Sequence, residues 1–119
     1  MNLYRYLSVG AVVAAVAMAG PAWAHARLVS SNPARDATVS SPSTIRLTFS
    51  ERLVPAFSRF EVTNASGAEQ TVRTVVSDDG LTITGTPART LAPGAYTITW
   101  TIASSDGHRM TGSYGFTVR

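Results

Sequence analysis

The chain contains two histidines, and each stands beside groups that favour metal binding. His25 directly follows Ala22-Trp23-Ala24, a small-x-small pattern typical of a signal-peptidase site. His108 lies two residues after Asp106, in the run Ser104-Ser105-Asp106-Gly107-His108. A histidine at a free amino terminus can offer its α-amine and its Nδ1 to one ion. The ordinary pKa of such an amine is about 7.7–8.0, so a metal can displace its proton near neutral pH.

These donors together favour copper. Two nitrogens from residue 25, the imidazole of His108 and the carboxylate of Asp106 would form a tetragonal N,O set, which suits Cu(II) and less often Ni(II). The absence of cysteine excludes thiolate ligands. In an extended segment Asp106 and His108 would share a face, whereas in a tight turn their side chains need not converge. Asp106 could also be a turn residue that bonds its own backbone, and His108 a solvent-facing loop residue.

Residues 1–24 are predicted to be a secretory signal peptide. The apolar run from Leu7 to Met18 is interrupted by Gly20 and Pro21 before the small-x-small pattern. A membrane anchor is the alternative, but the run is shorter than the roughly 20 residues that span a bilayer. We therefore expect cleavage between Ala24 and His25, which leaves one domain over residues 25–119 outside the cytoplasm.

The composition of residues 25–119 excludes several function classes. The segment carries nine arginines, no lysine and seven acidic residues. The arginines are spread along the chain without a basic run, so no nucleic-acid partner is expected. Without disulfides, a small exported domain depends on its core or on a ligand for stability.

Alternating apolar residues predict an all-β domain. The clearest strands are 44–50 and 95–103, where a period of two indicates one buried face. Weaker strands are predicted at 27–31, 59–63, 71–76, 81–84 and 113–118, separated by turn sequences such as Asp78-Asp79-Gly80 and Pro93-Gly94. This pattern predicts a seven-stranded antiparallel Greek-key β-barrel or sandwich of immunoglobulin-like type, with no helix.

Several motifs in the same order resemble the CopC family of periplasmic copper-binding (copper resistance) proteins, along nearly all of residues 25–119. They are His25–Pro33, Leu47–Glu51, Pro93–Tyr96 followed by Trp100, and Ser104–Gly112. The resemblance implies the Greek-key fold and one Cu(II) ion bound by the amine and imidazole of His25, by Asp106 and by His108. It also implies that Glu51 lies near the site as a weak ligand or as an acceptor that orients a histidine. The alternative for Glu51 is a solvated residue at a strand end.

The sequence departs from part of the family in its methionines. Some members also hold Cu(I) with a segment rich in methionine and histidine, but residues 52–76 contain neither. Met110 is the only methionine after residue 24, and one thioether cannot form a soft site alone. We therefore expect a Cu(II) site and no Cu(I) site.

The favoured function is that of a periplasmic copper carrier, a monomer and not an enzyme. It would buffer Cu(II) for homeostasis or resistance, or deliver it to a CopD-like inner-membrane copper transporter, as the resemblance implies. One alternative is a copper oxygenase with a histidine brace, although the short chain leaves little room for a substrate platform. The other is a metal-free immunoglobulin-like adhesion module, which leaves the placement of both histidines unexplained.

Overall fold

The computed structural model describes residues 26–119. The predicted signal peptide and His25 lie outside these residues. Within them the chain forms nine β-strands and one short 3₁₀ turn. The elements are β1 (Leu28–Asn32), β2 (Thr38–Val39), β3 (Ile45–Phe49), η1 (Pro55–Phe57), β4 (Arg59–Asn64), β5 (Glu69–Gln70), β6 (Val72–Val76), β7 (Thr82–Pro87), β8 (Gly94–Ala103) and β9 (Arg109–Val118).

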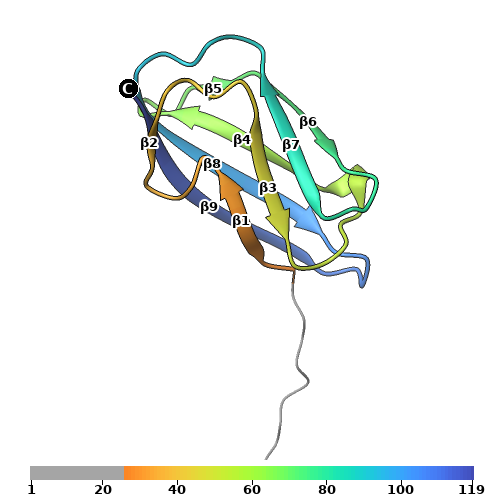
Figure 1. Cartoon of the computed structure of the whole chain (residues 1–119). Coiled ribbons are helices and arrows are strands. Elements are labelled where there is room, and N and C mark those ends of the chain that lie inside the picture. The colour runs from red at the N-terminus through yellow and green to blue at the C-terminus, as the bar shows by residue number, and fades with distance from the viewer. Residues whose placement is uncertain (1–25) are drawn as a thin grey trace, which may run out of the picture.

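The strands form two sheets that face each other as a sandwich (Figure 1). One sheet has the order β1-β3-β7-β6 and the other β2-β9-β8-β4-β5. Strands that are distant in sequence, such as β3 and β7, are neighbours, so the chain crosses repeatedly between the sheets. The prediction of an all-β fold is confirmed, and of the two predicted forms the sandwich is correct and the closed barrel is wrong.

The predicted count of seven strands, all antiparallel, is also wrong. β2 and β5 have two residues each and were not predicted, because so short a segment shows no alternation. β2 pairs with the end of β9 in a parallel arrangement, with Thr38 opposite Thr117. The Arg119 amide extends this contact by donating to the Val39 carbonyl at 3.0 Å. The remaining seven strands match the predicted segments, although β9 begins four residues earlier than expected and β7 ends three residues later.

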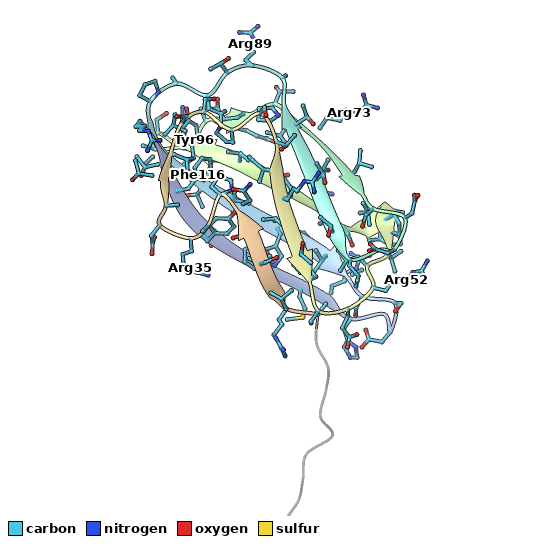
Figure 2. All side chains as sticks on the ribbon, in the orientation of Figure 1. Arg35, Arg52, Arg73, Arg89, Tyr96 and Phe116 are labelled. Carbon is cyan, nitrogen blue, oxygen red and sulfur yellow. The ribbon has the colours of Figure 1, made fainter. Side chains whose placement is uncertain are left out.

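The core lies between the sheets and follows from the alternation in β8. Ile98 and Ile102 are fully buried, while the threonines between them point to solvent, because successive side chains of a strand point to opposite faces. Tyr96 stacks on Phe116 with ring centroids 5.5 Å apart, and Figure 2 shows both rings between the sheets. The opposite sheet contributes buried residues from β3 and β7: Ile45, Leu47, Phe49 and Ile83.

One end of the sandwich gathers four chain segments, and we call it the β8–β9 end. It comprises the start of β1, the segment 50–54 after β3, and the β6–β7 and β8–β9 turns (Figure 1). Strand register places them together, since Leu28 pairs with Phe49 at the end of β3 and Ala103 pairs with Arg109. Within residues 26–119, no helix has the length and apolar character to cross a membrane.

Candidate metal centre

Residues 104–108 form a tight turn between β8 and β9. The Gly107 amide donates to the Ser104 carbonyl at 2.9 Å, and the Ser104 amide donates to the His108 carbonyl at 2.9 Å. Gly107 has φ of 89°, in the left-handed region that glycine adopts without a steric penalty. The sequence left open whether this segment is extended or a turn, and the structure shows a turn.

The side chains of Asp106 and His108 nevertheless come together. Asp106 Oδ1 accepts a hydrogen bond from the His108 amide at 3.0 Å and another from the Ser104 hydroxyl. The same oxygen lies 3.1 Å from His108 Nδ1. Asp106 therefore bonds its own backbone, as a turn residue does, and also contacts the imidazole. The two side chains are 42% and 41% exposed, so a solvated ion can reach both.

The hydrogen bonds to Asp106 keep its carboxylate ionised. The Ser104 hydroxyl, followed by the His108 amide, lowers the pKa of Asp106 from its ordinary 3.8 to about 2. Both donors bond the charged form and therefore favour it. The carboxylate is consequently an anion over the whole pH range in which an imidazole can bind a metal.

This pair has the chemistry of half a metal site. The hydrogen bonds converge on Oδ1, which leaves Oδ2 as the carboxylate oxygen to offer to a cation. In many metal centres a carboxylate beside one imidazole nitrogen orients the ring for the ion. Among residues 26–119 no three histidine or acidic side chains gather around one point.

The described chain begins at the same end as the Asp106–His108 pair. The Arg27 amide donates to the Ser50 hydroxyl at 3.0 Å, and the Ser50 amide donates to the Arg27 carbonyl at 2.9 Å. Ala26 is only 2% exposed. These contacts fix the entry of the chain into β1 beside the segment 50–54.

The segment 50–54 in turn holds the β8–β9 turn. The Ser105 amide donates to the Arg52 carbonyl at 3.0 Å, and the Val54 amide donates to the Ala103 carbonyl at 2.8 Å. Glu51 lies half-buried between the residues that bond Arg27 and Ser105. The structure does not gather it with Asp106 and His108 into a group of three. His25, the predicted chelating residue, lies outside the described residues.

Sequence reasoning did not assign a role to Ser104 or notice that its turn has a twin. The β6–β7 turn, Ser77-Asp78-Asp79-Gly80-Leu81, has the same Ser-x-Asp-Gly pattern. There the Ser77 hydroxyl donates to Asp79 Oδ1 at 2.6 Å, and the Leu81 amide donates to the same oxygen at 3.0 Å. Gly80 has φ of 74°. Leu81 occupies the position that His108 occupies in the other turn, and the repeated pattern was the signal that could have identified the motif.

Comparison with known proteins identifies the family. The CopC domain family matches residues 28–119. The chain is 35% identical to copper resistance protein C of Xanthomonas campestris pv. juglandis and 38% identical to copper resistance protein C of Pseudomonas syringae pv. tomato, in both cases over 100% of each chain. Its structure is similar to the crystal structure of PcoC, a methionine-rich copper resistance protein from Escherichia coli. That match has a TM-score of 0.74 and 35% identity, and it covers 81% of this chain and 100% of the other.

The family match covers all the strands of the sandwich, with the Ser104–His108 turn inside the matched residues. The motifs that suggested the resemblance lie, from residue 28 onward, within that match. The chain therefore belongs to the CopC family.

Proposed function

We propose that the protein, once cleaved before His25, binds one Cu(II) ion in the periplasm. The ligands are the α-amine and imidazole of His25, the carboxylate of Asp106 and the imidazole of His108. Glu51 serves as a weak ligand or as an acceptor that orients a histidine. The donors are three nitrogens and one oxygen, a set that Cu(II) favours in tetragonal geometry.

The observation that carries this proposal is the common location of two distant parts of the chain. The Arg27–Ser50 hydrogen bonds hold the start of β1 to the segment 50–54. The Ser105–Arg52 hydrogen bond holds the β8–β9 turn to the same segment. Consecutive Cα atoms are 3.80 Å apart, so residue 25 is joined to the fold at the end that carries Asp106 and His108. His25 can therefore share one binding site with Asp106 and His108, although about eighty residues separate them in the sequence.

The methionine content supports a Cu(II) site alone. PcoC is described as methionine-rich, whereas this chain has one methionine, Met110, among the residues that the structure describes. One thioether with no cysteine cannot supply the several soft sulfur ligands that Cu(I) prefers. Delivery between two oxidation-specific sites is therefore not part of the proposed function.

The role that fits this site is buffering and transport of copper outside the cytoplasm. Two relatives that match the whole chain are named as copper resistance proteins, which supports a role in copper homeostasis or resistance. We propose that the protein acts as a monomer, catalyses no reaction, and delivers Cu(II) to a CopD-like inner-membrane transporter.

The first test is to change only the amine of residue 25. We compare the protein that begins at His25 with one that carries a single glycine before it. The added residue converts the amine into an amide, which is not basic, so we expect Cu(II) affinity to fall by more than roughly 100-fold, or about 2.8 kcal/mol of binding free energy. Competition titration against a chromophoric chelator gives the affinity, and electron paramagnetic resonance gives the nitrogen content of the site.

The matched control adds the same glycine after Arg119. That end lies beside β2, with Arg119 bonded to Val39, and we expect this variant to bind Cu(II) as the processed protein does. Equal affinity of the amino-terminally extended and processed proteins would contradict the proposed site.

A further inference from the structure

Ser104 has a buried hydroxyl whose hydrogen bond goes to the side chain of Asp106. The residue is only 1% exposed. Its hydroxyl donates to Asp106 Oδ1, while its own amide and carbonyl form the two main-chain hydrogen bonds that close the turn. The hydroxyl also lies 3.4 Å from the His108 carbonyl, which already accepts the Ser104 amide at 2.9 Å. The strong acceptor of this proton is therefore the carboxylate.

We propose that Ser104 is a positioning residue of the Cu(II) site. It holds the Asp106 carboxylate in the orientation that contacts the His108 ring through Oδ1 and presents Oδ2 to the ion. This inference rests on the proposed Cu(II) function and assigns to it a residue that does not contact the metal.

The physical reason lies in the freedom of an aspartate side chain. The terminal torsion of a carboxylate is broad and roughly two-fold, so without an anchor the plane of the group turns readily. The His108 amide supplies one hydrogen bond from a fixed backbone position. The buried Ser104 hydroxyl supplies a second, and two donors on one oxygen define the orientation of the group. Restricting the ligand before the ion arrives removes an ordering cost from binding.

The twin turn separates positioning from turn stability. Ser77 makes the same hydroxyl bond to Asp79, in a turn closed by a similar pair of main-chain bonds: Gly80 amide to Ser77 carbonyl, and Ser77 amide to Thr82 carbonyl, both 2.8 Å. The second of these reaches one residue further along the chain than in the Ser104 turn, and the Ser77 hydroxyl also accepts the Thr82 amide at 3.0 Å. Leu81 stands there in place of a histidine. Removing the Ser77 hydroxyl therefore perturbs a similar turn at the same end of the sandwich and leaves the Asp106–His108 pair in place.

The experiment compares Ser104→Ala with Ser77→Ala in the protein that begins at His25. Partners that orient metal ligands typically contribute 10–100-fold to metal affinity, so we expect Ser104→Ala to raise the Kd for Cu(II) by about that factor. We expect Ser77→Ala to leave the Kd unchanged. Without copper, both variants should show a decrease in thermal midpoint, because each loses the hydroxyl bond to its aspartate, and Ser77→Ala also loses the bond from the Thr82 amide.

The second readout is the electron paramagnetic resonance spectrum of each variant loaded with one equivalent of Cu(II). A carboxylate that has lost its orientation changes the hyperfine splitting of the ion, whereas a loss of fold stability alone does not. We expect a changed spectrum for Ser104→Ala and the wild-type spectrum for Ser77→Ala.

Three outcomes would overturn the inference. Wild-type affinity and spectrum in Ser104→Ala would overturn it while leaving the proposed function intact. An equal loss of affinity in both variants, with unchanged spectra, would assign the effect to turn stability. Failure of the wild-type processed protein to bind Cu(II) would overturn the proposed function and this inference with it.

Discussion

At the scale of single residues, Asp106 makes two contacts through one carboxylate oxygen. It closes a turn by accepting the His108 amide, and it presents a carboxylate to an imidazole through the same oxygen. Bonding its own backbone therefore does not prevent Asp106 from offering a carboxylate to a metal, and the two interpretations that the sequence allowed do not exclude each other. Both contacts are possible because Asp106 and His108 are separated only by Gly107, whose positive φ turns the chain back toward Asp106.

The lowered pKa of Asp106 predicts an acid-dependent stability. A group whose pKa is about 2 in the folded protein and 3.8 ordinarily releases its proton more readily when folded. Its contribution to the free energy of unfolding is therefore fully present above pH 3.8 and is lost as the pH falls toward 2. We expect Asp106→Asn, without copper, to show a weaker decrease in the free energy of unfolding over this range. Urea titrations followed by Trp100 fluorescence at a series of pH values measure it.

The control for that measurement is the twin turn. The pKa of Asp79 is also lowered, mainly by the Ser77 hydroxyl and then by the Leu81 amide. Some acid sensitivity should therefore remain in Asp106→Asn and decrease further in the double variant with Asp79→Asn. An acid dependence of Asp106→Asn identical to that of the wild type would show that its carboxylate is not stabilised in the folded protein.

At the scale of elements, β9 depends on a glycine that contacts an aromatic ring across the sheet. Gly112 pairs with Trp100 of β8, and a Cβ at position 112 would overlap the Trp100 ring. Gly115 lies on the same strand, and a Cβ there would meet only the Tyr96 carbonyl oxygen at an ordinary 3.5 Å. A side chain is therefore sterically excluded at position 112 and tolerated at position 115.

We expect Gly112→Ala to displace the Trp100 ring and to lower the free energy of unfolding by about 1–3 kcal/mol, the usual cost of overpacking. Gly115→Ala is the matched control and should have an effect smaller than about 1 kcal/mol, because glycine is itself unfavourable within a strand. Urea unfolding gives the free energies, and the emission maximum of Trp100 reports the ring displacement. A loss of stability in Gly115→Ala as large as that in Gly112→Ala would contradict this account.

The sequence predicted the long elements better than their arrangement. Strands such as β3 and β8 were predictable because one buried face imposes a period of two over five or more residues. β2 and β5 were not, since their pairing depends on partners far along the chain, such as β9 for β2. The local Ser-x-Asp-Gly pattern accounts for the turn that brings Asp106 and His108 together, whereas the place of this turn beside the segment 50–54 depends on main-chain bonds to distant residues. The sequence showed that Asp106 and His108 lie in one motif, whereas the role of Ser104 emerged only from its hydrogen bond in the structure.

At the scale of the whole molecule, the core and the candidate site occupy separate places. The buried side chains fill the space between the sheets, whereas Asp106 and His108 stand on a turn at the β8–β9 end (Figure 1). The arginines labelled in Figure 2 project in different directions, with Arg52 and Arg89 at opposite ends of the sandwich. The fold thus holds the start of β1 and the β8–β9 turn, two distant parts of the chain, at one end of the sandwich.

Because the proposed Cu(II) ion would bind only the folded sandwich, copper should stabilise the folded protein against unfolding. A ligand at 100 times its Kd adds about 2.7 kcal/mol to the free energy of unfolding. We expect this increase for the protein that begins at His25 and a much smaller one, at the same free Cu(II) concentration, for the glycine-extended protein. Thermal unfolding at a series of buffered Cu(II) concentrations measures it. An equal rise in thermal midpoint for both proteins would place the ion away from residue 25.

The half-exposed position of Asp106 and His108 would also determine how a bound copper ion leaves the protein. An ion held at the rim of a sandwich can be approached by incoming donor atoms while its first ligands are still attached. Exchange would then proceed by stepwise ligand replacement, without any opening of the hydrophobic interior. The lifetime of the bound ion would accordingly vary with the concentration of competing chelators and remain insensitive to mutations that change only the rate of global unfolding.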